Sequence, residues 1–190
     1  MDADATIVPD AAAWRAWLDE HEDASDGVWL VVAKKGTLIP TSLTYAQALD
    51  EALCSGWIDG QKRPRDEATF LQRFTPRRPR SIWSQRNIGL VDALVAQGRM
   101  RPRGQAEVER ARADGRWERA YAGAATAVVP DDLAAALAAS PAAAELFARL
   151  TAVNRYAVIH RVTTASPTAR AGRIATLVGR LAEGRTPYPQ

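Results

Sequence analysis

The chain has 190 residues, enough for one domain or one domain with a helical extension, and its 47% hydrophobic content excludes wholesale disorder. No apolar run approaches the roughly 18 residues that span a bilayer, and the acidic start lacks the features of a signal peptide, so we expect no membrane insertion and a cytoplasmic location. The net charge of +3 hides an asymmetry, because residues 1–60 carry 11 acidic and 3 basic side chains whereas residues 61–120 carry 15 basic and 7 acidic ones.

The first third of the chain predicts one helix and one strand. Asp10 is placed to cap a helix whose apolar stripe includes Trp14 and Leu18, at the spacing of an amphipathic helix. The apolar, β-branched run 28–33 then predicts a strand that is buried on both faces.

A second helix and two further strands are expected before residue 76. Thr44 and Gln47 form a capping-box pattern, and the helix that follows should run to about Ser55. Asp59-Gly60 predicts a hairpin turn if strands flank it. The alternating run 69–75 predicts a half-exposed strand.

The second half of the chain reads as helical. Ser84 is expected to cap a helix that stops at Gly98, residues 104–114 form another, and Asp131 caps a third. Ser140 and Ser166 are each followed by a proline, a pattern typical of an N-cap and the first residue of a helix. The last helix is expected to stop at Gly184. We therefore predict an α+β fold, with a small N-terminal sheet and its helices followed by a mainly helical C-terminal half packed on it. We expect one compact unit over residues 1–190, with subregions 1–83 and 84–190.

Several motifs resemble those of the YdeI/OmpD-associated family of bacterial proteins. They are the runs 52–61 and 74–84, Gly98-Arg99-Met100, the run 114–121, Pro130-x-Asp132-Leu133 and Thr168-x-Arg170. The resemblance extends in order over nearly the whole chain and implies a suspected role in bacteriocin protection. The family usually has a Lys before its last motif, where this chain has Ala165-Ser166-Pro167.

The best candidate for a binding site is the basic loop, residues 77–81. Prolines stiffen it, so that fewer conformations would be lost on binding an anion. Hydroxyl groups and the start of the expected helix at Ser84 would add hydrogen-bond donors. The alternative is a solvated loop whose arginines pair with the acidic first third. The residues that we assign to the ligand site are Arg77, Arg78, Arg80, Ser81, Trp83, Ser84, Asn87, Trp57 and Asp59.

Three of these residues have simpler structural interpretations. Trp57 and Trp83 could stack on a planar ligand, but most of six tryptophans in a small domain must pack in its core. Asp59 could point its carboxylate into the cleft of the arginines, or could simply be the turn residue of Asp59-Gly60.

Catalytic and cofactor signals are weak. Cys54 could be a nucleophile only with a nearby base, and the sequence cannot place His21 or His160 beside it, so we interpret it as a buried structural residue. Two isolated histidines and one cysteine lack the spacing of metal ligands, and phosphate-loop and dinucleotide-binding motifs are missing. We expect no metal and no cofactor, and we identify no catalytic residue.

The sequence thus predicts a non-catalytic protein that binds an anionic or phosphorylated small molecule or protein partner at the basic loop. Two alternatives stay open. One is nucleic-acid binding through the basic middle third, and the other is an enzyme with a cleft formed by Cys54, Asp59, His160 and the arginines.

Overall fold

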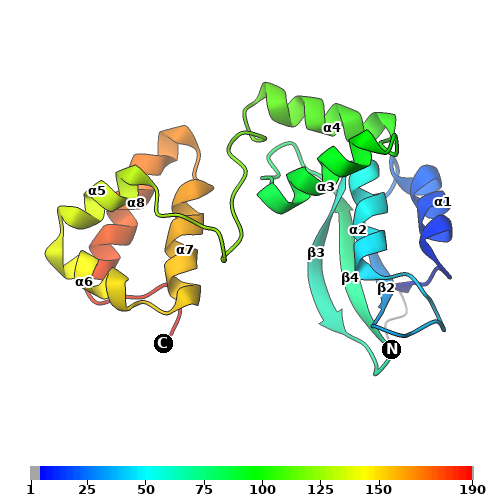
Figure 1. Cartoon of the computed structure of the whole chain (residues 1–190), viewed down its shortest axis with the longest axis horizontal. Helices are drawn as coiled ribbons and strands as arrows, with labels where there is room; N and C mark the ends of the chain where they lie inside the picture. The colour runs from blue at the N-terminus through cyan, green and yellow to red at the C-terminus, as the bar shows by residue number, and fades with distance from the viewer. Residues whose placement is uncertain (1–4, 190) are drawn as a thin grey trace. The chain divides into compact units, whose positions relative to one another are not determined.

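The structure, a computed structural model, describes residues 5–189 and confirms the α+β class. Its contacts fall into two compact units, which we describe separately (Figure 1). Unit 1 comprises residues 1–81 and 87–115, and unit 2 comprises residues 82–86 and 116–190. The expectation of one compact unit over the whole chain stays a prediction.

Unit 1 contains a four-stranded sheet of order β1-β2-β4-β3. β1 (Ala5–Thr6) runs parallel to β2 (Val28–Ala33), and β4 (Thr69–Pro76) lies antiparallel between β2 and β3 (Trp57–Pro64). The expected strand at 28–33 is confirmed, whereas the expectation of a half-exposed strand at 69–75 is wrong. Leu71 and Gln72 lie on opposite faces of β4 and are both buried, so neither face of the strand is open to solvent there.

The prediction of a hairpin turn at Asp59-Gly60 is also wrong. Both residues lie inside β3, where the register with β4 shifts between Asp59 and Lys62. The side-chain amide of Gln72 donates to the carbonyl oxygens of Gly60 (3.0 Å) and Gln61 (3.2 Å), and thereby satisfies the backbone at this irregularity. The turn that joins β3 to β4 lies beyond Pro64, where the Asp66 carboxylate accepts from the amide of Ala68 at 2.9 Å.

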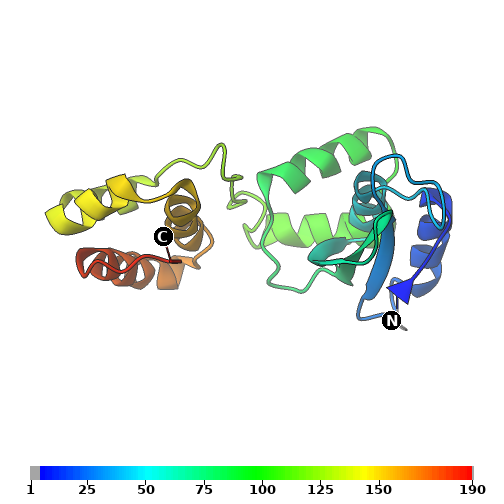
Figure 2. The same cartoon turned by 90° about the horizontal axis from the view of Figure 1, so that it is seen from below.

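Two helices pack on the sheet face that carries Phe74 and Trp57 (Figure 2). They are α1 (Ala11–His21) and α2 (Tyr45–Cys54). Both predicted caps are confirmed, since Asp10 accepts from the Ala13 amide and Thr44 forms a capping box with Gln47. Trp14 is fully buried, with its ring centroid 5.7 Å from that of Phe74 and its indole N–H donating to the Ala48 carbonyl. The core of unit 1 lies between these helices and the sheet.

α3 (Gln85–Ala96) begins directly after Ser84 and ends before Gly98, as predicted, while α4 (Pro102–Ala113) begins two residues earlier than expected, with a proline in its first turn. Residues 87–96 of α3 and all of α4 belong to unit 1. Buried Arg101, just before α4, joins this segment to α2. Its guanidinium donates to the Glu51 carboxylate (3.0 Å), the Glu51 carbonyl (3.0 Å) and the Ser55 hydroxyl (2.9 Å).

Unit 2 is built from α5 (Asp131–Ala138), α6 (Pro141–Arg149), α7 (Ala152–Thr163) and α8 (Pro167–Ala182). α8 contacts the other three helices, and their shared core includes Leu133, Phe147, Val158 and Leu177. Asp131 is the first residue of α5 and not its cap, because Pro130 occupies the cap position. The expected cap at Ser166 is confirmed, since its hydroxyl accepts from the Ala169 amide at 3.3 Å.

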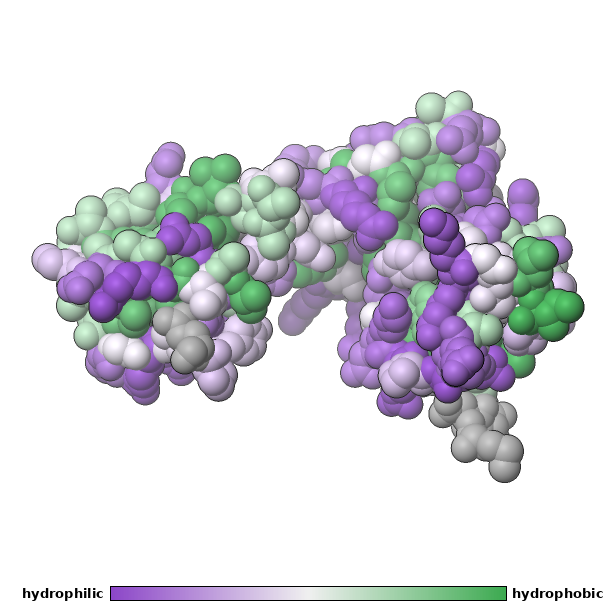
Figure 3. All heavy atoms as spheres, turned by 60° about the horizontal axis from the view of Figure 1, so that its bottom comes forward, coloured by the Kyte–Doolittle hydropathy of each residue, from purple (hydrophilic) through white to green (hydrophobic). Residues whose placement is uncertain are grey.

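Figure 3 shows hydrophilic side chains over much of the surface of unit 1, with a marked apolar patch at its edge and smaller apolar areas elsewhere. The most exposed large apolar residues of this unit are Leu38 (75%) and Ile39 (84%), in the segment between β2 and α2. Within residues 5–189, no helix combines the length and the apolar character needed to cross a membrane.

Candidate functional site

The residues assigned to the ligand site divide between the two units. Trp83 and Ser84 belong to unit 2, and the other seven belong to unit 1. The part that can be described as one site is therefore the basic loop, with Trp57, Asp59 and Asn87 as its expected neighbours in unit 1.

The basic loop is a closed turn that presents two arginines. The amide of Arg78 donates to the Ser81 hydroxyl (3.0 Å), and the amide of Ser81 donates to the Arg78 carbonyl (2.9 Å). Arg78 and Arg80 are exposed on this turn, with Pro79 between them. Proline restricts the backbone there, so the two guanidinium groups extend from a fixed base.

Arg77 differs from its neighbours because it is buried, with 7% of its surface exposed. Its amide donates to the Gly56 carbonyl at 3.0 Å and so holds the start of the loop against the junction of α2 and β3. Arg77 therefore anchors the loop, and the exposed positive charge comes from Arg78 and Arg80.

The two tryptophans are core residues. Trp57 is fully buried and makes an edge-on contact with Trp17, at 5.9 Å between ring centroids. Trp83, in unit 2, is 2% exposed and packs on Trp117 at 4.9 Å. Neither ring presents a free face for stacking, so the structural interpretation of both tryptophans holds. Asn87 is buried as well.

Asp59 is half-buried in β3, and its carboxylate accepts a hydrogen bond from the Tyr45 hydroxyl at 2.8 Å. This bond links β3 to the first turn of α2. The alternative role as a turn residue is excluded by its position inside the strand.

Cys54 and His160, the two groups considered for catalysis, lie in different units. Burial, together with the nearby Glu51 carboxylate, raises the pKa of the Cys54 thiol to about 11. Burial and the neighbouring Arg161 lower the pKa of His160 in unit 2. Within residues 5–189, no group of three His, Cys, Asp or Glu side chains could hold a metal ion.

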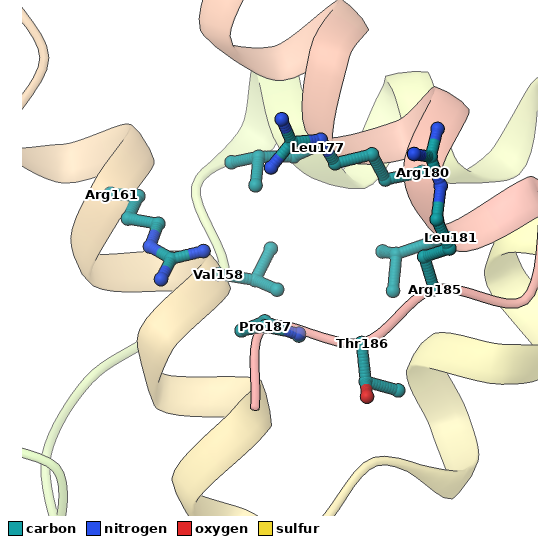
Figure 4. Close-up of a pocket in the computed structure, with 8 residues that line it drawn as sticks. All are labelled: Val158, Arg161, Leu177, Arg180, Leu181, Arg185, Thr186 and Pro187. Carbon is teal, nitrogen blue, oxygen red and sulfur yellow. The ribbon is translucent and has the colours of Figure 1, made fainter. Parts of the chain in front are cut away.

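Unit 2 contains a second cluster of arginines that the sequence did not predict. Arg161, Arg180 and Arg185 line one pocket of unit 2, together with apolar side chains of α7 and α8 (Figure 4). Their spacing along the chain gives no sign of this, because only the packing of α7 on α8 brings Arg161 to the other two.

Two motifs from the resemblance meet in unit 2. Arg170 of Thr168-x-Arg170 forms two hydrogen bonds with the carboxylate of Asp132 from Pro130-x-Asp132-Leu133, at 2.6 and 2.9 Å. Arg170 also donates to the carbonyl of Val162 at 2.9 Å. The motifs therefore fasten α5, α7 and α8 to one another.

Comparison with family models gave two matches. The model described as Domain of unknown function (DUF8412) matches residues 6–107, and the model described as Bacteriocin-protection, YdeI or OmpD-Associated matches residues 126–184. The latter confirms the resemblance over residues 126–184, which include Asp132 and Arg170, whereas the motifs between residues 52 and 100 lie in the other matched segment. Comparisons with curated proteins and with solved structures gave no match.

Proposed function

Since the chain belongs to the family described as Domain of unknown function (DUF8412) and matches the YdeI/OmpD-associated model over residues 126–184, we propose that it is a non-catalytic cytoplasmic protein that binds an anionic or phosphorylated partner. The binding element is the basic loop. The observation that carries the proposal is the closed turn of Arg78 and Ser81, which presents the guanidinium groups of Arg78 and Arg80 to solvent.

The chemistry of the turn supports a phosphate or carboxylate ligand. A guanidinium group donates two parallel hydrogen bonds to such an anion, and a turn that is already closed loses little conformational entropy on binding. Arg77 is buried, and its backbone amide holds the start of the loop. The backbone therefore has little conformational entropy left to lose when Arg78 and Arg80 bind an anion.

The test compares the parent protein with the double variant Arg78→Gln/Arg80→Gln. Pyrophosphate and a nucleoside triphosphate are the probes, and the melting temperature is measured with and without each probe. We expect a probe to raise the melting temperature of the parent and not of the double variant. Because both side chains are exposed, the two proteins should melt alike without the probe.

The control variant is Lys35→Gln, which removes an exposed cation from the turn after β2. It should respond to the probes as the parent does. An equal rise in the parent and in the double variant would show that the anion binds elsewhere, and would contradict the proposal.

We also propose a protective role against bacteriocins or related stress, in line with the description of the family model that matches residues 126–184. A strain that lacks this protein should be more sensitive to bacteriocins than its parent. Complementation with the Arg78→Gln/Arg80→Gln protein should fail if protection needs the loop, while complementation with Lys35→Gln should succeed. Equal sensitivity of the deletion strain and its parent would refute the role.

A further inference from the structure

Unit 2 contains a pocket of about 130 Å³ between α7, α8 and the segment that follows α8 (Figure 4). Its apolar surface comes from Val158 of α7 and from Leu177 and Leu181 of α8, which are all buried in the core of the unit. The floor of the pocket is therefore apolar and is held in place by the packing of the core.

The wall formed by the last residues is held in place by specific bonds. Gly184, with φ of +76°, ends α8, and the amides of Gly184 and Arg185 donate to the carbonyls of Leu181 (3.0 Å) and Arg180 (2.8 Å). This pattern is a Schellman motif, which reverses the chain and brings Arg185 back beside Arg180.

Asn154 of α7 fixes the continuation of this wall. Its buried side-chain amide donates to the Tyr188 carbonyl (3.1 Å) and accepts from the Tyr188 amide (2.8 Å), while the Thr186 hydroxyl donates to the same carbonyl (2.7 Å). Because the backbone is held on both sides of Pro187, the pocket is formed before any ligand arrives.

Three arginines surround the apolar floor. Arg185 is paired with Glu183, and the Arg161 guanidinium lies over the ring of Tyr188 at 5.6 Å. The side chain of Arg180 has no ion pair or hydrogen bond within the part of the chain that the structure describes. Within the described residues, Arg185 is thus the one of these three arginines that has a carboxylate partner. Unit 2 as a whole has ten arginines against five acidic residues.

We propose that this pocket binds a phosphate monoester whose organic group is small and apolar. The phosphate carries about two negative charges at neutral pH, and these would offset the two arginines that have no carboxylate partner. The apolar group would lie against the floor formed by Val158, Leu177 and Leu181, and its own apolar surface would be removed from water there. This site is separate from the basic loop and does not depend on it.

The test is calorimetric titration of the full chain with phenyl phosphate at low ionic strength. We expect phenyl phosphate to bind more tightly than inorganic phosphate, because only phenyl phosphate reaches the apolar floor, and more tightly than benzoate, which carries a single charge. Arg180→Gln and Arg161→Gln should each weaken the binding of phenyl phosphate by about tenfold or more, since each removes a charge-assisted hydrogen bond.

The matched control is Arg173→Gln, an exposed arginine two turns earlier on α8 that does not line the pocket. It should bind as the parent does. The proposal fails if the parent does not bind phenyl phosphate or if Arg180→Gln binds with parental affinity. Loss of binding in Arg78→Gln/Arg80→Gln alone would assign the ligand to the basic loop and overturn the pocket as its site.

Discussion

The single cysteine of the chain has the properties of a core residue. Cys54 is fully buried at the end of α2, and burial together with Glu51 raises the pKa of its thiol from about 9 to about 11. Since the folded protein holds this proton more tightly than the unfolded chain does, the contribution to stability is present below pH 9. It is lost as the pH rises through the pKa of the folded state.

We expect Cys54 to resist iodoacetamide at neutral pH. Only about one thiol in ten thousand is ionised at pH 7 when the pKa is about 11, and the sulfur has no access to solvent. Mass spectrometry should find the thiol unmodified in the native protein and fully modified in a denaturant. Rapid modification of the native protein would restore the alternative of a Cys54 nucleophile.

At the scale of secondary structure, α2 and α4 approach so closely that one position excludes a side chain. A Cβ atom at Gly104 would overlap the carbonyl oxygen of Cys54 at the end of α2. Gly89 of α3 provides a matched comparison, because a Cβ atom there would meet no other atom within 4 Å.

Gly104→Ala should lower the free energy of unfolding by about 1–3 kcal/mol, the usual cost of overpacking. Gly89→Ala should raise it by about 0.5–1 kcal/mol, because alanine restricts the unfolded chain and favours the helix. Urea denaturation followed by circular dichroism measures both changes. A neutral or stabilising effect of Gly104→Ala would mean that the two helices can separate at little cost.

In unit 2 the ion pair between Asp132 and Arg170 joins α5 to α8. Its hydrogen bonds lower the pKa of the Asp132 carboxyl below the ordinary value of 3.8. A carboxyl with a lowered pKa in the folded state stabilises the protein above its unfolded pKa, and this contribution is lost as the pH falls through the folded pKa.

Asp132→Asn should therefore melt at a lower temperature than the parent at neutral pH. In acid the two melting temperatures should approach each other, because the parent's Asp132 becomes protonated as well. Glu145→Gln is the control, since it breaks an exposed pair with Arg149 on a single helix and should change the melting temperature little. Melting curves recorded from pH 7 down to pH 3 provide the measurement. A constant difference at every pH would show that the ionised carboxylate is not the source of the effect.

At the scale of the whole molecule, each unit has its own apolar core. The core of unit 1 includes Leu30 of β2, and the core of unit 2 includes Leu133 of α5, and both leucines are fully buried. The charges also separate by unit, because unit 2 has a surplus of five positive charges and unit 1 has a surplus of two negative charges.

Leu133→Ala should speed hydrogen exchange at the amides of α5 to α8 and leave the amides of β2 and β4 as protected as in the parent. The cavity left by the missing side chain should lower the free energy of unfolding of unit 2 by about 2–5 kcal/mol. It should leave unit 1 unchanged, because Leu133 packs only in the core of unit 2. Leu30→Ala is the reciprocal variant, and it should speed exchange at the amides of β2 and β4 but not at those of α5 to α8. Equal loss of protection in both units would show that they unfold together.

The sequence by itself determined the features that depend on neighbouring residues. The caps at Asp10, Thr44 and Ser166, the strand at 28–33 and the helix stop at Gly184 were predictable, because each rests on bonds or steric limits within a few positions. The closed turn of the basic loop has the same local origin.

Only the tertiary structure decided which residues meet across the chain. Asp59-Gly60 became part of a strand because β3 pairs with β4 on both sides of it, and Arg77 became an anchor because the loop starts against Gly56. The pocket of Arg161, Arg180 and Arg185 likewise exists only because α7 packs on α8 and the chain folds back at Gly184. Contacts between distant residues depend on the packing of whole elements, and no local pattern records them.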